Sequence, residues 1–177
     1  MPLDVIKLVV RYEAALLEAT LAFSNIKAKP AAVSTAKSIP PQSDYDIFVS
    51  YSRADEQCAR YLCQSLNNLG ASVFIDTSEI EVGMAWLRRI GTILDRCTVV
   101  AALYSPEYLK SKMCQFEFDV ALSRQLELGR NVLFPILLMD SELPTFMRLT
   151  NYRDCRVLDR DKLTLAANEI VQRTKRE

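Results

Sequence analysis

The sequence predicts an α/β fold, with a five-stranded parallel sheet in the flavodoxin-like order flanked by helices. Strand-like and helix-like segments alternate five times between residues 45 and 173. The strand-like segments are short, continuous apolar runs, which are typical of parallel strands buried on both faces. Such alternation predicts parallel strands joined by right-handed crossovers. A span of about 130 residues for five units fits an order in which the first strand is central.

Residues 1–29 are predicted to form an extra N-terminal helix. Between Leu3 and Lys27 there is no glycine or proline, and apolar side chains recur at alternating four- and three-residue steps, which is a heptad pattern. Two interpretations stay open, namely a helix packed on its own domain and a helix for self-association or a partner. Charged residues interrupt every apolar run here, so we expect neither a signal peptide nor a membrane span.

A linker is predicted over residues 30–43, followed by a folded domain over residues 44–177. The segment Lys29–Gln42 contains three prolines and two serines and has no periodicity. This composition argues against packed structure and favours a domain boundary near Ser43.

The first half of the predicted domain contains two strands. Tyr45–Ser50 is too short for a helix and rich in strand formers, and it ends in a polar turn over residues 50–53. Ala54–Leu69 has helical spacing, and Gly70 follows it as a left-handed cap. Ser72–Asp76 is expected to be the second strand.

The middle of the domain repeats this pattern. A loop, Thr77–Gly83, leads to a predicted helix over Met84–Arg96. Thr98–Tyr104 is an apolar run that predicts the third strand. A polar connection beginning at Ser105 then enters a predicted helix over Lys112–Leu128. Ligands of open α/β sheets bind where such connections leave the strands.

The fourth strand is predicted over Val132–Leu138, and Pro135 marks it as near an edge or bulged because proline lacks an N–H. The remaining segments are expected to be a loop or short helical turn, a short fifth strand and a closing helix: Asp140–Asp154, Arg156–Leu158 and Asp159–Arg173. Asp159 is a suitable N-cap for the closing helix.

Composition excludes several classes of function. Lys+Arg and Asp+Glu balance at 22 each, so no long-range attraction to nucleic acid is expected. The chain has no histidine, which removes histidine-based triads and imidazole metal sites, and we expect no metal. Five cysteines without a CxxC pair are typical of buried thiols in a reducing compartment, so we expect a cytoplasmic protein.

Four segments, in their order and spacing, resemble a Toll/interleukin-1 receptor (TIR) domain. They are YDIFVSYSRAD, VFIDTSEIEVGMAW, VVAALYSPEYLKSKMCQFEFDVAL and VLFPILL. The resemblance covers about residues 44–175 and is greatest to bacterial-type members that cleave NAD+. A phosphoacceptor receiver domain has the same strand order, but it requires an aspartate where this chain has Tyr104 and Ser105.

The resemblance places the family's catalytic glutamate at Glu117. Its pattern is similar to W-C-x-x-E, and here Met113 stands in place of the usual aromatic residue, followed by Cys114. These three side chains share one helix face. A carboxylate suits NAD+ cleavage because nicotinamide leaves as a neutral molecule from an oxocarbenium-like transition state. From position alone, Glu117 also fits an ordinary solvated helix face.

Further substrate-binding candidates lie at the carboxyl end of the first strand. Ser50, Tyr51, Ser52 and Arg53 carry hydroxyls and a guanidinium that could hold pyrophosphate or ribose. The alternative is turn chemistry with an exposed arginine.

Four more candidates complete the set. Asp76 could bond a ribose hydroxyl or cap the following loop, and Trp86 matches an aromatic family position but also suits core packing. Met113 and Cys114 adjoin Glu117 in sequence, and Cys114 is expected to be buried rather than nucleophilic.

The resemblance implies one of two functions. The first is an NAD+ glycohydrolase or cyclase, active on self-association in signalling or defence, with NAD+ as substrate and no separate cofactor. The second is a non-catalytic scaffold that engages other TIR domains through the Thr77–Gly83 loop and the adjacent helix. The methionine at position 113 favours the scaffold.

Overall fold

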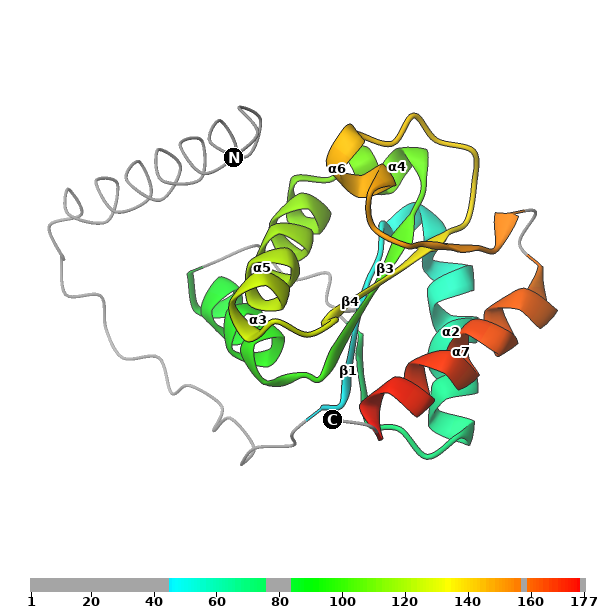
Figure 1. The fold of residues 1–177 in the computed structure, drawn as a ribbon, viewed down its shortest axis with the longest axis horizontal. Helices are drawn as coiled ribbons and strands as arrows, with labels where there is room; N and C mark the ends of the chain where they lie inside the picture. The colour runs from blue at the N-terminus through cyan, green and yellow to red at the C-terminus, as the bar shows by residue number, and fades with distance from the viewer. Residues whose placement is uncertain (1–44, 76–83, 157–158, 176–177) are drawn as a thin grey trace, which may run out of the picture. The chain divides into compact units, whose positions relative to one another are not determined.

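The computed structural model describes residues 45–75, 84–156 and 159–175 (Figure 1). Its elements are β1 (Ile47–Ser50), η1 (Arg53–Asp55), α2 (Glu56–Asn68), β2 (Val73–Ile75), α3 (Met84–Arg96), β3 (Val99–Tyr104), α4 (Pro106–Lys110), α5 (Lys112–Leu128), β4 (Leu133–Leu137), α6 (Thr145–Arg148), β5 (Arg153–Asp154) and α7 (Arg160–Thr174). The predicted N-terminal helix over residues 1–29, the linker over residues 30–43, Asp76 and Thr77–Gly83 lie outside the described residues.

The strands form one parallel sheet in the order β2-β1-β3-β4-β5. This confirms the predicted flavodoxin-like sheet. The pairing of β1 with β3 runs without interruption from Ile47 to Ser50. The carboxyl ends of these two strands therefore lie side by side at one end of the sheet, where α4 begins (Figure 1).

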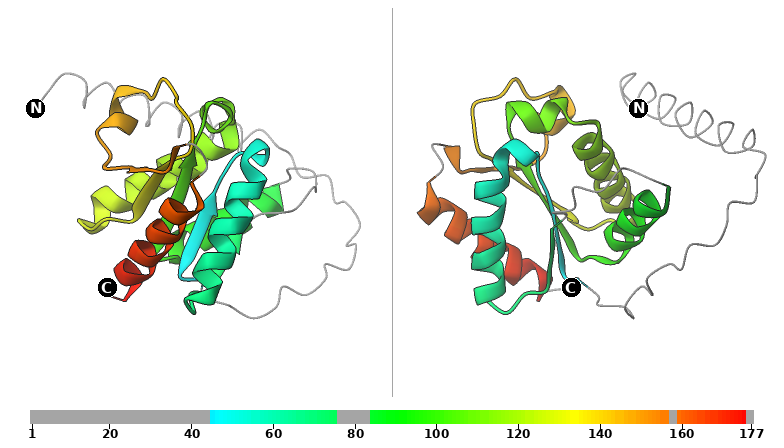
Figure 2. Two further views of the ribbon diagram at one scale, coloured as in Figure 1. Left: turned by 90° about the vertical axis from the view of Figure 1, so that its right-hand side faces the viewer. Right: turned by 180° about the vertical axis from the view of Figure 1, so that it is seen from behind.

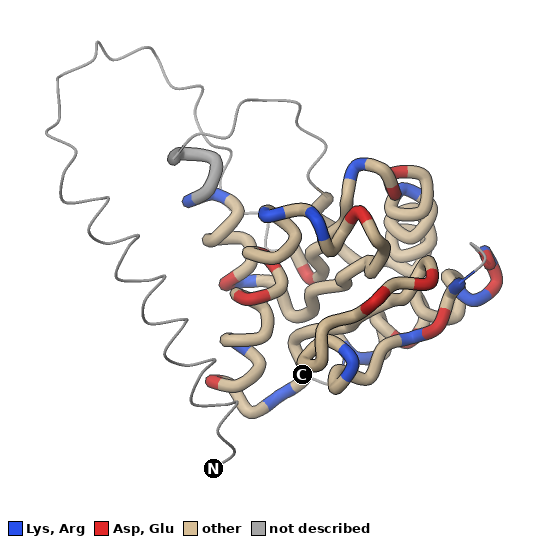
Figure 3. The backbone as a smooth tube through the Cα atoms, turned by 90° about the horizontal axis from the view of Figure 1, so that it is seen from above, with Lys and Arg blue, Asp and Glu red and all other residues tan. Residues whose placement is uncertain are grey.

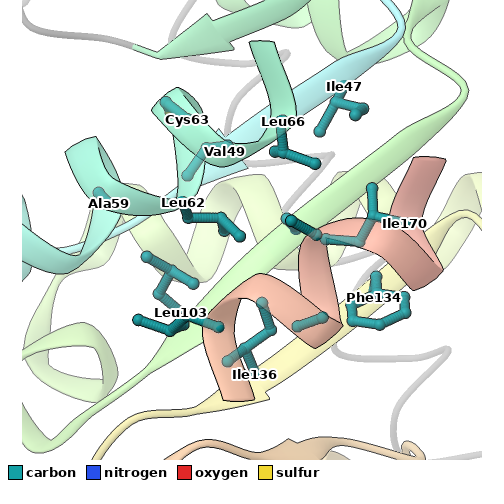
Figure 4. Packing of buried hydrophobic residues seen from close by; sticks show 14 of the residues in the cluster. Ile47, Val49, Ala59, Leu62, Cys63, Leu66, Leu103, Phe134, Ile136 and Ile170 are labelled. Atoms are coloured by element: carbon teal, nitrogen blue, oxygen red, sulfur yellow. The ribbon is translucent and has the colours of Figure 1, made fainter. Parts of the chain in front are cut away.

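Helices α2 and α7 cover one face of the sheet (Figure 2). Every second residue of the strands points to this face, because side chains alternate along a strand. The core on this side includes Ile47, Val49, Leu62, Leu66, Leu103, Ile136 and Ile170 (Figure 4). Burying one such side chain contributes about 1.5–3 kcal/mol, so this layer holds the two helices against the sheet.

Helices α3 and α5 cover the opposite face (Figure 2). The alternate strand residues point here, and Phe48 and Phe74 stack with ring centroids 5.4 Å apart. Leu94 of α3 and Phe118 of α5 are 0% and 1% exposed. Helix α5, which carries Glu117, is therefore held against β1 and β4 on this face.

The fifth strand lies earlier in the chain than the sequence predicts. It is Arg153–Asp154, and both its residues are exposed. Of the predicted strand Arg156–Leu158, residues 157 and 158 lie outside the described residues. It pairs with β4, and Arg156 holds its end through a bidentate ion pair with Asp154 at 2.6 and 2.9 Å. An apolar pattern could not locate this strand, because backbone pairing and surface charge hold it.

A second difference concerns the connection after β3, which contains an unpredicted short helix, α4. Ser105 caps it by accepting a hydrogen bond from the Tyr108 N–H at 3.0 Å, and Pro106 occupies the first turn. Serine followed by proline is a common helix start. Ser111 ends α4 and caps α5, accepting from the Cys114 N–H at 3.3 Å.

Pro135 lies in β4, which is next to the edge strand, as predicted, and its register with Ala102 of β3 continues the ladder without a bulge. The Leu137 carbonyl accepts from the Cys155 N–H on the β5 side. The backbone N–H and C=O groups of every second residue in a strand point toward the same neighbouring strand. Pro135 therefore faces β5, whose pairing begins only at Ile136. The missing N–H costs no strand pairing there.

Two predicted helix ends are confirmed. Gly70 has φ +84°, the left-handed conformation that follows α2. The Asp159 side chain accepts from the N–H groups of Asp161 and Lys162 at the start of α7. The short helical turn expected within residues 140–154 is α6.

Charged residues of both signs are interspersed along the described backbone (Figure 3). None of the helices among the described residues combines the length and apolar character needed to cross a bilayer. All five cysteines lie in the described part, and their side chains are buried and unpaired as disulfides. This confirms the prediction that the cysteines are buried core residues.

Candidate functional site

The candidate site lies where β1 and β3 end. Apart from tyrosines and cysteines, the buried polar side chains of the described residues are four, namely Ser50, Asp55, Ser105 and Glu117. Buried polar groups need hydrogen-bond partners, and all four find them here. These four buried polar side chains therefore gather at the carboxyl end of the sheet.

Helix α5 delivers Glu117 to this end of the sheet. Cys114, Glu117, Phe118 and Ala121 form its buried stripe, at the spacing expected for one helix face. The Glu117 side chain lies within an otherwise apolar stripe and is 5% exposed. The alternative of a solvated helix-face glutamate is therefore wrong.

Ser50, the last residue of β1, holds the Glu117 carboxylate. Its hydroxyl donates to Glu117 Oε2 at 2.5 Å. This length falls in the range of O–H···O⁻ bonds, which are about twice as strong as neutral ones. A serine at a strand end thus fixes a carboxylate on a helix 67 residues later.

Tyr108 of α4 is the second hydroxyl of this cluster. Its phenol lies 3.0 Å from Ser50 Oγ and 3.3 Å from the Cys114 carbonyl oxygen, to which it can donate. The side chain is 0% exposed, and this burial raises the pKa of Tyr108 well above its ordinary value. Tyr108 therefore remains a neutral hydroxyl at physiological pH.

A second buried carboxylate, Asp55, ends the 3-10 turn after β1. Ser105 donates to Asp55 Oδ2 at 2.5 Å, and no partner for Oδ1 is found among the described residues. Asp55 is 3% exposed, and burial raises its pKa, an effect that the Ser105 hydrogen bond opposes. Since Ser105 also accepts from the Tyr108 N–H, the two carboxylates are connected through Ser105, Tyr108 and Ser50.

Cys114 is buried beside these groups. Burial raises the pKa of its thiol to about 12, against a hydrogen bond from Ser111, while the nearby charges of Glu117 and Asp55 raise it further. A thiol with this pKa is almost fully protonated at neutral pH, and the thiolate is the nucleophilic form. The prediction that Cys114 is buried is confirmed, and covalent catalysis by this cysteine is disfavoured.

The remaining candidates lie around this cluster. Tyr51 is half-buried and packs on the core layer under α2 and α7, whereas Arg53 is exposed. Ser52 precedes η1 with extended backbone, and its side chain makes no capping bond. Met113 is half-buried against the opposite core layer.

The described residues do not include the side chains of two further candidates, Trp86 and Asp76. Trp86 lies in the first turn of α3, and Asp76 lies outside the described residues. In the described part of the chain, no group of three or more acidic or thiol side chains is arranged to hold a metal ion.

Sequence reasoning missed three members of the cluster, Asp55, Ser105 and Tyr108. The serine-proline pair at position 105 signals the start of α4, and recognising it would have placed Tyr108 on a helix. The local sequence carries no signal for the contact of Asp55, because its partner lies 50 residues away.

Chemically, the cluster presents a carboxylate with a fixed hydrogen-bond donor in a largely dehydrated setting. Such a group stabilises positive charge developing beside it, since electrostatic interactions strengthen where water is excluded.

Several curated proteins are similar to this chain. It is 28% identical over 105 residues to the 2' cyclic ADP-D-ribose synthase BtTIR of Bacteroides thetaiotaomicron, covering 59% of this chain and 36% of that protein. It is 29% identical over 93 residues to the NAD(+) hydrolase TcpC of Escherichia coli, covering 52% and 30%. It is 29% identical over 97 residues to the probable 2' cyclic ADP-D-ribose synthase BdTIR of Brachypodium distachyon, covering 54% and 41%. The matches thus span less than half the length of each relative.

Solved structures share the fold. The TIR domain of the Toll-related receptor TRR-2 from Hydra magnipapillata superposes with a TM-score of 0.58 at 19% identity, over 74% of this chain and 98% of that one. A TIR-STING receptor from C. gigas gives 0.57 at 22% identity, over 73% and 39%. A sequence profile of the TIR domain matches residues 47–167. This match, which takes in both strands and all four buried polar residues of the cluster, means that the chain belongs to the TIR domain family.

Proposed function

We propose that this chain cleaves NAD+ at the bond between nicotinamide and ribose, releasing nicotinamide and ADP-ribose or a cyclised form of it. The single observation that carries this proposal is the burial of Glu117 at the carboxyl ends of β1 and β3, with its carboxylate held by Ser50 at 2.5 Å. The activities named for the similar proteins from B. thetaiotaomicron and E. coli support it.

The reaction suits a single carboxylate. The bond from ribose C1′ to the pyridinium nitrogen breaks, and its electron pair leaves with nicotinamide, which becomes neutral. Positive charge then develops on the ribose, and Glu117 stabilises it. Water, or a hydroxyl of ADP-ribose in the cyclising reaction, attacks C1′ and loses a proton. No histidine, metal or separate cofactor takes part in this scheme.

Residues after the first two strands would hold the rest of the substrate. Ser50, Tyr51, Ser52 and Arg53 offer hydroxyls and a guanidinium to ribose and pyrophosphate. Asp76 would bond a ribose hydroxyl.

The helix residues would shape the nicotinamide end. Met113 and Cys114 would line the face next to Glu117, without the ring stacking that an aromatic residue at position 113 would add. Trp86 would contribute from α3.

Self-association would assemble the active form in a cytoplasmic signalling or defence role, through contacts between TIR domains. The predicted helix over residues 1–29 would assist. Deleting residues 1–29 and measuring the oligomer size by light scattering tests this role, because an unchanged size excludes the helix as an assembly device.

The test of the catalytic proposal compares Glu117→Gln with Glu127→Gln, a change on the same helix near its exposed end. We expect the purified wild-type chain, concentrated with a crowding agent, to consume NAD+ and release nicotinamide. Glu117→Gln should lower this rate by about 1000-fold, and Glu127→Gln should leave it unchanged. Equal rates for the two variants would refute the role of Glu117.

A non-catalytic scaffold is the second candidate function, and Met113 in the aromatic position favours it. An associated wild-type sample that leaves NAD+ intact would support the scaffold. In that case the chain would act through contacts with other TIR domains alone.

A further inference from the structure

Tyr108 occupies the centre of the buried polar cluster. Its phenol lies 3.0 Å from Ser50 Oγ and 3.3 Å from the Cys114 carbonyl, while its N–H donates to Ser105. Tyr108 is 0% exposed, and its ring packs against that of Tyr104 with the ring centroids 5.6 Å apart. The hydroxyl is therefore fixed in place, and only its proton can change direction.

Counting protons gives the cluster two alternative arrangements, because a hydroxyl donates only one hydrogen bond. When the Glu117 carboxylate is charged, Ser50 donates to it and accepts from Tyr108. When Glu117 carries a proton, it donates to Ser50, Ser50 donates to Tyr108, and Tyr108 donates to the Cys114 carbonyl. The distances from Ser50 to Glu117 and to Tyr108, and from Tyr108 to the Cys114 carbonyl, allow both hydrogen-bond arrangements without movement of heavy atoms.

We propose that Tyr108 is a positioning residue for Glu117, and that the Ser50–Tyr108 pair reverses its hydrogen-bond direction when Glu117 gains or loses its proton. This rests on the proposed function only in that Glu117 is the carboxylate of NAD+ cleavage. The Cys114 carbonyl makes the reversal possible, because it accepts a hydrogen bond from the Tyr108 hydroxyl when Ser50 donates to Tyr108 instead of accepting from it.

The charged arrangement gains more from this chain of hydroxyls. Tyr108 donating to Ser50 polarises the Ser50 hydroxyl, which strengthens its bond to the carboxylate. Hydrogen bonds to a charged form favour that form. Removing the phenol should therefore make Glu117 retain its proton to higher pH, and the rate of a reaction that needs the carboxylate should fall on the acid side.

Other titratable groups also face this cluster. Cys114 comes from α5, Tyr104 from β3 and Asp55 from η1. Burial raises the pKa of Cys114 to about 12 and that of Tyr104 well above its ordinary value, so neither titrates near neutral pH. Asp55, whose pKa burial also raises, is the group whose titration must be separated from that of Glu117.

The experiment compares Tyr108→Phe with Tyr104→Phe. Both remove one phenolic oxygen from adjoining buried rings, but the Tyr104 hydroxyl faces Thr150 at 3.4 Å instead of Ser50. We expect Tyr108→Phe to lower kcat for NAD+ by about tenfold at neutral pH, with KM changed by less than about twofold, and to shift the acid limb upward by about one pH unit. Tyr104→Phe should keep the wild-type profile.

A second measurement does not depend on activity. In protein labelled with ¹³C at glutamate side-chain carboxyls, the Glu117 signal is assigned by its absence in Glu117→Gln, and Asp55 is not labelled. Tyr108→Phe should move the titration midpoint of this signal to higher pH, and Tyr104→Phe should not.

These two readouts separate the possible failures. A wild-type chain that leaves NAD+ intact, but whose Glu117 signal shifts in Tyr108→Phe, removes the proposed function and leaves the positioning role in place. A Glu117 signal that titrates identically in Tyr108→Phe and Tyr104→Phe overturns the positioning role, whatever the activity.

Discussion

Two groups of charged side chains in this molecule differ in their contact with water. At the ends of β1 and β3, the carboxylates of Asp55 and Glu117 are 3% and 5% exposed and bonded to serines. Beside β5, the Arg156 side chain is 43% exposed and pairs with Asp140 and Asp154. The comparison shows that buried charge, which is costly to maintain, marks the candidate site, whereas exposed charge only fastens an edge strand.

The largest effect on this comparison is expected from Ser50→Ala. The substitution removes the hydroxyl that donates to the buried Glu117 carboxylate. It should therefore lower the free energy of unfolding by about 2 kcal/mol and the rate of NAD+ cleavage by about 100-fold. Urea unfolding and nicotinamide release measure the two. Ser65→Ala is the control, because the Ser65 hydroxyl only donates to the Tyr61 carbonyl within α2. Equal losses in both variants would contradict the special role of Ser50.

An intermediate effect is expected from Asp55→Asn. Burial raises the pKa of Asp55 in the folded state, so the folded chain binds this proton more tightly than the unfolded chain. Stability should therefore fall as pH rises from the ordinary aspartate value through the raised one. Asp55→Asn should flatten this slope and stabilise the chain by about 1 kcal/mol at pH 8.

Chemical denaturation at several pH values measures this slope. Asp95→Asn, an exposed change on α3, should leave the slope as in the wild type. A slope that stays unchanged in Asp55→Asn would show that Asp55 is charged at no cost, and the contrast between the two regions would disappear for this residue.

The smallest effect is expected from Arg156→Ala. Exposed ion pairs contribute little, so the melting temperature should drop by about 2 °C or less, and by still less in 1 M salt. Arg156 lowers the pKa of Asp154 to about 2, so its contribution is present above the ordinary aspartate value and is lost as pH falls through about 2. Scanning calorimetry should show wild type and variant converging there. A large, salt-insensitive loss would mean that the exposed pairs resemble the buried ones.

The strands were predictable wherever burial determines them. β1 and β3 are fully buried, and a continuous apolar run records that burial in the sequence. β5 was not predictable, because Arg153 and Asp154 are exposed and owe their position to pairing with β4. Local sequence carries no trace of such a partner.

The candidate site was predictable only in part. Glu117 was found through its resemblance to a family pattern, since periodicity alone fits an exposed glutamate equally well. Asp55 and Tyr108 were missed because their contacts join segments that the sequence keeps apart. Ser50 was selected for its place at the carboxyl end of a strand, and that reasoning holds wherever parallel strands end together.

The five buried cysteines give the chain an internal reporter of its own opening. Burial raises the pKa of Cys63 and Cys114 to about 12 and that of Cys97 and Cys155 to about 11. Alkylating reagents and peroxide react with exposed thiolates, so the folded chain should resist both. The rate at which a maleimide dye labels each thiol then reads out how often that part of the core meets solvent.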